Sequence, residues 1–446
     1  MGMSKKKVLA LAEEANVQFV NLQFTDIVGT LKAVTIPVWK LEDAIENNVW
    51  FDGSSIEGFT RIHESDMFLK PDLGTFAVIP WTRKAESGVR ARIICDVYMP
   101  DGEPFEGDPR HILKRQLDRA KGLGYVFNVG PELEFFLFKK ENGVLSPQPH
   151  DEAGYFDQTT DAASEIRQEM TFALQAFGID VEALHHEVAI GQHEIDFRYC
   201  DALSGADAAV TLRYALKSIA ARHDLHATFM PKPIAGINGS GMHVHQSLFT
   251  TEGENKMFDK NGLYSLSDFA RSFIAGQLHH IKALNAVINP TINSYKRLVV
   301  GYEAPVNVAW GQRNRSVLIR VPRYTPGREK AVRVEIRCPD PAANPYLAFA
   351  VLLAAGLDGV ERNMIAPDPV EDDIFEMSRE EIAERGIGSV AANLKDALEA
   401  LAADDVVRSA LGEFTFQKFY QAKMNEWDDY RVAVSQWELE RYLEIH

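Results

Sequence analysis

The sequence predicts a mixed α+β protein with two domains. Its 446 residues are too many for one typical hydrophobic core. A Pro- and Gly-rich stretch at residues 100–109 separates a first part, in which one helix precedes short strands, from a longer part in which helical and strand patterns alternate. With 46% hydrophobic and 25% charged residues, the composition is that of an ordinary globular protein.

The first part is expected to contain one amphipathic helix and several strands. Residues 20–25 alternate apolar and polar side chains, as in a half-buried strand, and residues 31–37 can pair with them across a turn at 26–29. Further strands are expected at 76–80 and 92–99. The Gly- and Ser-rich segment FDGSSIEGF, residues 51–59, is expected to be a loop.

The second part carries clear helix start signals. Asp108-Pro109 and Asn344-Pro345 each combine an N-cap residue with proline at the first helical position. Other helices are expected at 164–177 and 206–223, and strands at 135–138, 194–197, 227–230, 241–248, 317–321 and 332–337. The most apolar stretch, residues 346–357, is too short to cross a bilayer, so we expect a buried core helix. The C-terminal part is expected to be helical, with its aromatic residues in the core and in subunit contacts.

The charge and the cysteines restrict the function. A net charge of −17 argues against direct nucleic-acid binding, which needs clustered basic residues. The three cysteines, Cys95, Cys200 and Cys338, are far apart and form no CxxC pair. They fit a reducing compartment and give no support to a zinc site. We therefore expect a cytoplasmic protein that binds neither membranes nor nucleic acids.

Six side chains that could bind metal recur in short motifs with strand-like alternation. Alternation places Glu132 and Glu134 on one face of a strand, and likewise His243 and His245. The six candidates are Glu132, Glu134, Glu187, Glu194, His243 and Glu335. The alternative is that they are unrelated surface carboxylates among 64 acidic residues, but their recurrence favours a common site. Mostly oxygen ligands with one imidazole indicate magnesium or manganese.

Basic and glycine-rich motifs accompany these candidate ligands. In the segment 333–337, Arg333, Glu335 and Arg337 alternate with valine and isoleucine, which is typical of a strand between a wet cavity and the core. Lys296, Arg297, Arg313, Arg315 and Arg320 could bind carboxylate or phosphate, and NGSGMH could bring backbone amides close to a ligand. Neither GxxxxGK[ST] nor GxGxxG precedes a helix, so a nucleotide would have to be held mainly by metals and arginines.

These motifs, in this order and over essentially the whole chain, resemble type I glutamine synthetases: FDGSSIEGF, GPELEFF, HHEVAIGQHEID, NGSGMHVHQS, NSYKRLVVGYEAP, RNRS and RVEIRCPDPAANPYLA. The resemblance implies a small N-terminal β-grasp domain, residues 1–103, and a catalytic domain, residues 104–446, whose antiparallel strands line a funnel. It also implies a dodecamer of two stacked hexameric rings, with active sites shared between neighbouring subunits.

The resemblance also implies a role for each matching residue. One metal would be held by Glu134, Glu187 and Glu194, and the other by Glu132, His243 and Glu335. Glutamate would be bound by Asn238, Gly239, Arg297, Glu303 and Arg337. ATP would be bound by Glu182, Tyr199, His245, Ser247, Arg315, Arg320 and Arg333. Asp52, Glu303 and Arg315 would be catalytic, with Asp52 reaching into the neighbour's site to take a proton from ammonium and Glu303 shielding the intermediate from water. His185, His186 and His193 are expected to be structural or to support the ligands, rather than to bind metal themselves.

The implied activity is ATP-dependent ligation of ammonia to L-glutamate through γ-glutamyl phosphate, in feedback-regulated nitrogen assimilation. Two alternatives are a ligase that uses a larger amine and a non-catalytic relative that binds transcription factors. Intact Asp52 and Glu303 argue against the first, and the complete set of metal ligands argues against the second, although a transcription-regulator partner is compatible with catalysis.

Two positions bear on regulation. Arg61 resembles an arginine that is linked to feedback inhibition in the alpha subclass of the family. Phe375 stands where the adenylylated subclass has its tyrosine. We therefore expect a member of the alpha subclass that is not adenylylated.

Overall fold

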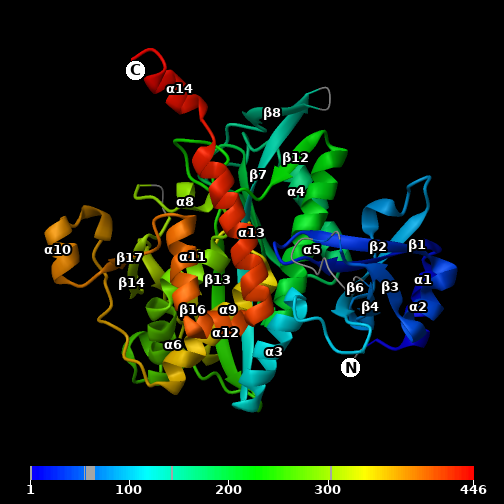
Figure 1. Ribbon diagram of the computed structural model, residues 1–446, viewed down its shortest axis with the longest axis horizontal. Coiled ribbons are helices and arrows are strands. Elements are labelled where there is room, and N and C mark those ends of the chain that lie inside the picture. The colour runs from blue at the N-terminus through cyan, green and yellow to red at the C-terminus, as the bar shows by residue number, and fades with distance from the viewer. Residues whose placement is uncertain (1–2, 55, 57–65, 142–143, 302–303, 446) are drawn as a thin grey trace.

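The computed structural model describes residues 3–54, 56, 66–141, 144–301 and 304–445. A small N-terminal domain lies beside a larger domain that contains both a sheet and many helices (Figure 1). The small domain has helices α1 (Lys5–Glu14) and α2 (Leu41–Asn47) on a sheet with the strand order β2-β1-β6-β4-β3, in which β5 pairs with β6. The strands are β1 (Val17–Thr25), β2 (Leu31–Pro37), β3 (Val49–Asp52), β4 (Asp66–Pro71), β5 (Ala77–Val78) and β6 (Val89–Tyr98).

The predicted β1–β2 hairpin is confirmed, and its turn contacts the catalytic domain. The Asp26 carboxylate accepts a hydrogen bond from Thr30 N at 2.7 Å, and Gly29 has φ +89°, which favours glycine. A Cβ atom on Gly29 would lie 3.2 Å from Asn344, which itself donates to the Asp26 carbonyl at 3.1 Å. The strand expected at 76–80 is only two residues long, because 3-10 turns begin at Leu73 and at Pro80 on either side of it.

The catalytic domain is built on one large sheet with the order β17-β14-β15-β16-β13-β7-β10-β9, in which β8, β11 and β12 also pair with β7. Its strands are β7 (Tyr125–Glu141), β8 (Val144–Pro149), β9 (Val181–His186), β10 (Gln192–Phe197), β11 (Cys200–Asp201), β12 (Leu225–Thr228), β13 (Met242–Thr250), β14 (Asn307–Gly311), β15 (Val317–Arg320), β16 (Val334–Ile336) and β17 (Gly388–Ser389). The expected antiparallel pairing holds except between β14 and β15, which run parallel.

Helices cover this sheet and fill the core. They are α3 (Pro109–Gly122), α4 (Ser164–Ala176), α5 (Ala202–Arg222), α6 (Asp268–His279), α7 (Ile281–Ile288), α8 (Ser294–Arg297), α9 (Pro345–Glu361), α10 (Arg379–Glu384), α11 (Leu394–Ala403), α12 (Asp405–Leu411), α13 (Glu413–Val432) and α14 (Gln436–Tyr442). Both predicted N-caps are confirmed: the Asp108 side chain accepts from Arg110 N, and that of Asn344 from Tyr346 N. Helix α9 is buried along almost its whole length, as expected. No helix among the described residues is long and apolar enough to cross a bilayer.

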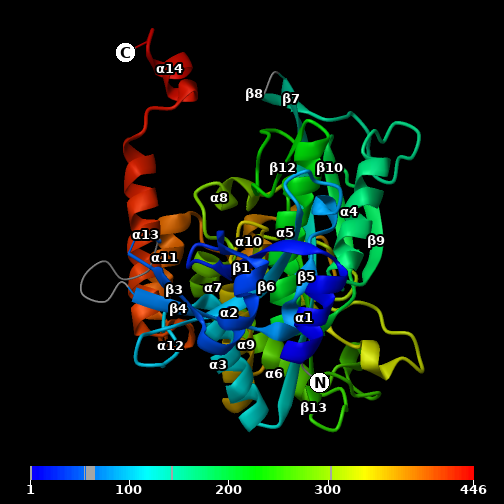
Figure 2. The same cartoon turned by 90° about the vertical axis from the view of Figure 1, so that its right-hand side faces the viewer.

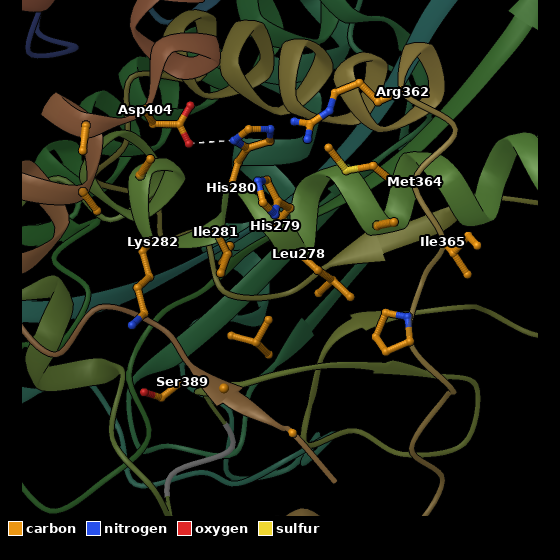
Figure 3. Close-up of a pocket in the computed structure, with 18 residues that line it drawn as sticks. Leu278, His279, His280, Ile281, Lys282, Arg362, Met364, Ile365, Ser389 and Asp404 are labelled. Atoms are coloured by element: carbon orange, nitrogen blue, oxygen red, sulfur yellow. Dashed lines mark hydrogen bonds and ion pairs between the residues drawn. The ribbon is translucent and has the colours of Figure 1, made fainter. Parts of the chain in front are cut away.

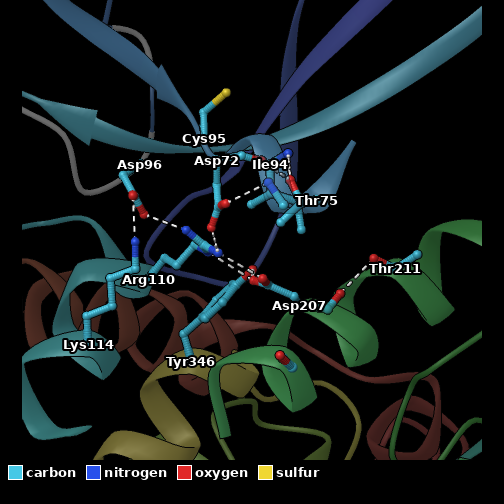
Figure 4. A network of polar contacts seen from close by, with 12 residues as sticks. Asp72, Thr75, Ile94, Cys95, Asp96, Arg110, Lys114, Asp207, Thr211 and Tyr346 are labelled. Atoms are coloured by element: carbon cyan, nitrogen blue, oxygen red, sulfur yellow. Dashed lines mark hydrogen bonds and ion pairs between the residues drawn. The ribbon is translucent and has the colours of Figure 1, made fainter. Parts of the chain in front are cut away.

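A buried arginine holds the two domains together (Figure 4). Arg110, at the start of α3, contacts Asp72 at 2.7 Å and Asp96 at 2.8 Å in the small domain. On its other side it contacts Asp207 of α5 at 2.9 Å, which also accepts the Tyr346 hydroxyl at 2.7 Å. Burial alone would raise the pKa of Asp96, but Arg110 and Lys114 lower it. A charged network therefore spans the domain boundary.

A cavity of about 830 Å³ lies at the junction of α6 and α7 (Figure 3). Most of its walls are apolar, and its polar residues include His280, which lies 2.6 Å from Asp404 and 3.0 Å from Asp358. Asp404 is the N-cap residue of α12, and Asp358 belongs to α9. His280 therefore ties three helices together.

The C-terminal helix α14 projects from the body of the molecule beyond the end of α13 (Figures 1 and 2). Its apolar side chains are exposed: Trp437 is 59% exposed and Leu443, just after the helix, is 72% exposed. In contrast, Phe416 and Phe419 at the start of α13 are buried. The expectation of core positions is thus confirmed only for the first part of the aromatic series.

Candidate active site

Strand register brings the predicted metal ligands together. Glu134 of β7 lies opposite Glu194 of β10, and Glu132 lies opposite His243 of β13. On the other edge of β13, Glu335 of β16 lies opposite His245. Glu187 directly follows β9, at the turn into β10. The cavity that these strands form has a volume of about 300 Å³, and all six candidate ligands line it.

Two groups of side chains in or beside this cavity lie close enough to share a cation. The first, Glu132, His243 and Glu335, is the set expected for the second metal, and its potential ligand atoms lie within 4.8 Å of one another. The second group contains His185, Glu187 and Glu194. His185 lies 3.4 Å from Glu187 and 3.3 Å from Glu194, so it contacts two of the expected ligands directly.

Glu134 lies between the two groups. Its Oε2 atom accepts from Gln192 Nε2 at 2.7 Å and from Gly241 N at 3.0 Å. Its Oε1 atom is 4.0 Å from His243 Nε2. Two hydrogen bonds thus orient Oε2 of Glu134, while Oε1 lies toward the imidazole of His243.

The two groups differ in charge balance. Burial raises the pKa of Glu335, but His245, His243 and the neighbouring arginines outweigh it, so the net shift is downward. Burial and the charge of Glu187 raise the pKa of Glu134 to about 8, and burial with the surrounding carboxylates raises that of Glu194 well above its ordinary value. Such shifts are expected where carboxylates crowd in a low-dielectric cavity without enough positive charge.

The donor set therefore fits divalent cations. The oxygen-rich ligands with one imidazole match magnesium or manganese, and the excess negative charge around Glu134 and Glu194 would be neutralised by such an ion. Glu335, at 2% exposed, is held by Arg320 and by Arg337, whose Nε atom lies 3.2 Å away. These two arginines therefore hold the Glu335 carboxylate in place.

A second cavity of about 390 Å³ shares Glu132 with the first. It is lined by five residues expected at the nucleotide: Glu182, Tyr199, His245, Ser247 and Arg333. Arg333 Nε donates to His245 Nδ1 at 3.1 Å, so the other ring nitrogen carries the proton that points to Glu132 Oε1 at 2.7 Å. The other two expected nucleotide residues, Arg315 and Arg320, line the first cavity instead.

The glycine-rich loop before β13 allows close packing around Arg297. A Cβ atom on Gly239 would lie 2.2 Å from the Pro231 carbonyl oxygen, and one on Gly241 would lie 2.6 Å from Arg297 Nη2. Arg297 comes from the short helix α8, is 4% exposed, and donates to the Cys338 carbonyl at 2.8 Å. The site is thus built from a helix and loops as well as from strands.

Asp52 does not line either cavity of its own chain. Asp52 is exposed at the end of β3, and its Oδ1 atom accepts from Ser54 N at 2.8 Å. Among the residues that the structure describes, those that line the two cavities all belong to the catalytic domain. Glu303 and Arg61 lie outside the described residues.

Some residues of the site were not predicted from the sequence. Gln192 lines the first cavity and holds Glu134; its place two residues before Glu194 on the same strand face could have revealed it. Tyr155 also lines this cavity and stacks on Phe156 with ring centroids 3.8 Å apart, edge-on to His185. No periodic pattern marks the loop that carries these aromatic residues.

A third group, Asp151, His186 and His193, has the spacing of a metal site but different chemistry. Arg167 can only donate, and it lies 2.8 Å from His193 Nδ1, so the proton of this imidazole remains on Nε2 and blocks ligation there. Burial lowers the pKa of His186, but its hydrogen bonds to Asp151 and to the Glu187 carbonyl raise it overall. The group is a buried ion-pair network.

Comparisons with known proteins agree with this fold and site. The family model of the glutamine synthetase catalytic domain matches residues 106–442, and that of the glutamine synthetase β-grasp domain matches residues 16–100. The chain is 52% identical to a glutamine synthetase of Thermus thermophilus over 99% of both chains. It is 53% identical to one of Clostridium saccharobutylicum, over 99% of this chain and 98% of the relative. A solved structure described as a GmaS/ADP complex superposes with a TM-score of 0.88 at 34% identity, covering 98% of this chain and 99% of that one.

The β-grasp domain and the acidic, arginine-lined cavity define a metal- and ATP-using ligase, and the chain belongs to the glutamine synthetase family. It is a glutamate–ammonia ligase, an enzyme that makes glutamine from glutamate and ammonia.

Proposed function

We propose that the enzyme works through γ-glutamyl phosphate, which ATP and glutamate form in the two joined cavities before ammonia attacks. A carboxylate is a poor acyl donor, so phosphorylation must come first. The observation that carries this proposal is the register of four strands, which gathers six metal-ligand candidates and the arginines Arg315, Arg320 and Arg337 around one cavity. The ADP named in the solved relative supports a nucleotide in the neighbouring cavity.

Two divalent ions, magnesium or manganese, are proposed at this site. Glu132, His243 and Glu335 would hold one ion, and Glu134, Glu187 and Glu194 the other. The position of His185 between Glu187 and Glu194 makes it an additional candidate at the second ion. When bound, such ions neutralise phosphate oxygens during phosphoryl transfer.

The basic residues would bind and orient the substrates. Arg297 with Asn238 and Gly239 lies at the end of the cavity near Glu134, where a guanidinium fork can orient glutamate. Arg315, Arg320 and Arg337 lie toward Glu335, where fixed positive charge stabilises the transferring phosphoryl group. Glu182, Tyr199, His245, Ser247 and Arg333 are proposed to bind ATP.

Ammonium must lose a proton before it can attack the acyl phosphate. We assign this step to Asp52 of a neighbouring subunit, because Asp52 is exposed and the cavities of its own chain are lined by the catalytic domain in the described part of the structure. Glu303 is assigned the exclusion of water, which would otherwise hydrolyse the acyl phosphate.

A site shared between subunits requires an oligomer, and we propose a cytoplasmic dodecamer of two stacked hexameric rings. The division between the domains is placed at residues 103 and 104, between β6 and α3. The exposed apolar residues of α14 support a subunit contact at the C-terminus, since exposed apolar patches commonly mark such contacts. A transcription-regulator partner is compatible with this assembly.

Regulation is proposed to follow the alpha subclass, through reversible inhibition by glutamine in which Arg61 takes part. Covalent AMP attachment is not expected, because Phe375 has no hydroxyl group to accept it.

A phosphate-release assay that compares ammonium with small primary amines tests the proposed function. Ammonium should give the highest kcat/KM, and hydroxylamine should trap the acyl phosphate. A larger amine with a higher kcat/KM than ammonium would overturn the assignment of ammonium as the substrate. Glutamine formation without phosphate release would overturn the proposed γ-glutamyl phosphate intermediate.

A further inference from the structure

The loop that carries Arg315 makes an unusually short connection. Strands β14 and β15 are parallel neighbours, yet only residues 312–316 join them. Parallel strands normally need a connection of about a dozen residues or more. The loop must therefore return along the sheet within five residues.

One carboxylate from a distant segment holds the start of this loop. Glu371 Oε1 accepts from Gln312 N at 2.7 Å, and Oε2 accepts from Arg313 N at 2.8 Å. The Tyr264 hydroxyl also donates to Oε1, at 2.7 Å. Burial acts to raise the pKa of Glu371, but these hydrogen bonds outweigh it and the net shift is downward. Glu371 is therefore held as the carboxylate that can accept all three bonds.

The segment around Glu371 follows the loop along its length. Val370 N donates to the Trp310 carbonyl at 2.8 Å, and Ile374 N donates to Ser316 Oγ at 3.4 Å. A Cβ atom on Gly311 would lie 2.6 Å from the Val370 carbonyl oxygen. Residues on both sides of Glu371 thus contact the end of β14 just before the loop and the last residue of the loop.

The other side of the loop faces the active site. Arg337 donates to the Arg315 carbonyl, and Arg337 Nε also lies 3.2 Å from Glu335. Arg315 and Arg337 line the active-site cavity and also an adjoining cavity of about 450 Å³ that contains Glu371. A continuous set of contacts therefore runs from Tyr264 through Glu371 and the loop to the arginine wall of the site.

We infer that Glu371 is a positioning residue: together with Tyr264 it fixes the 312–316 loop so that Arg315 faces the phosphoryl group. The inference rests on the proposed role of Arg315. Glu371 does not line the active-site cavity and acts only through the loop. The same contacts make residues 370–374 the segment whose movement would displace Arg315.

The test compares kcat and KM of the full-length enzyme for Glu371→Gln, Arg315→Lys and the double variant. Glutamine keeps the side-chain shape, but its amide nitrogen cannot accept a hydrogen bond from a backbone N–H of the loop. We expect kcat to fall roughly 10- to 100-fold with little change in the KM for glutamate, because small misplacements of a catalytic group have effects of this size. Asp372→Asn, which breaks only the 2.8 Å pair with Arg385, is the matched control and should retain wild-type kcat.

The double variant distinguishes positioning from general structural damage. If Glu371 acts through Arg315, the Glu371→Gln effect should be much smaller in the Arg315→Lys background. An equal loss in both backgrounds, or a kcat within about twofold of wild type for Glu371→Gln, would overturn the inference. If Arg315→Lys alone retains full activity, the proposed role of Arg315 fails instead. Should Glu371→Gln not assemble, Tyr264→Phe, which removes one of the three hydrogen bonds, should show a smaller loss with the same dependence on Arg315.

Discussion

Arg110 should control how tightly the N-terminal domain is held against the catalytic domain. In Arg110→Met most of the side-chain volume is kept, but Asp207 and Asp72 lose their cation, while Asp96 keeps Lys114 at 2.6 Å. Breaking a buried pair typically costs about 3–5 kcal/mol. Because Asp72 is 36% exposed and can be hydrated, we use the lower end, about 3 kcal/mol, which is roughly a 100-fold change in the docking equilibrium.

Hydrogen exchange followed by mass spectrometry measures this equilibrium directly. Peptides from residues 66–98 should lose roughly 100-fold in protection in Arg110→Met, while those from β13 should not change. Arg119→Met, on the same helix as Arg110, is the control, since the pair of Arg119 with Glu361 of α9 is partly exposed and worth at most about 1 kcal/mol. Wild-type protection of residues 66–98 in Arg110→Met would refute the view that this network fastens the domains.

Four other outcomes are expected. Glu335→Ala should abolish activity with the assembly preserved, because it removes a proposed ligand; wild-type turnover with magnesium would contradict the metal assignment. Asp52→Ala should slow amination by ~10²–10⁴-fold, and mixed oligomers with Glu335→Ala subunits should regain activity if the site is shared. Burial lowers the pKa of His280 from 6.5, but its hydrogen bonds to two aspartates raise it overall. Its stabilisation is thus present below 6.5 and is lost as the pH rises through the raised value, so His280→Gln should destabilise the protein more at about pH 6 than at about pH 9 in urea unfolding. Intact-mass analysis of protein from nitrogen-rich cells should show no added AMP, and an AMP adduct at any site would refute the proposed regulation.

The sequence predicted those parts of the site that depend on local alternation. Glu132 and Glu134 share a strand face, and the charged face of residues 333–337 borders the two cavities, because side chains alternate along strands. The pairing of β7 with β10 and β13 was not predictable from local pattern, since it depends on contacts between residues far apart in the chain. For the same reason, Arg110 could not be recognised from local pattern as the link between the domains.

Other features depend on three-dimensional surroundings rather than on residue type. Histidines in HHEV look alike in the sequence, yet His185 faces the cavity carboxylates while His186 is paired with Asp151. Glu371 lies in a segment with no periodic pattern. Its hydrogen bonds from the backbone of Gln312 and Arg313 become visible only in the folded structure. The parallel pairing of β14 with β15 was not predicted either, because no local pattern marked residues 307–311 as a strand.

Glu132 forms a common wall between the two cavities. One oxygen accepts from His245 on the side of the second cavity, and the other lies 3.5 Å from His243 on the side of the first. A ligand that changes the charge near either imidazole changes the field that the other cavity experiences. Such coupling is reciprocal, so a nucleotide that strengthens glutamate binding must itself bind more tightly when glutamate is present, by the same factor.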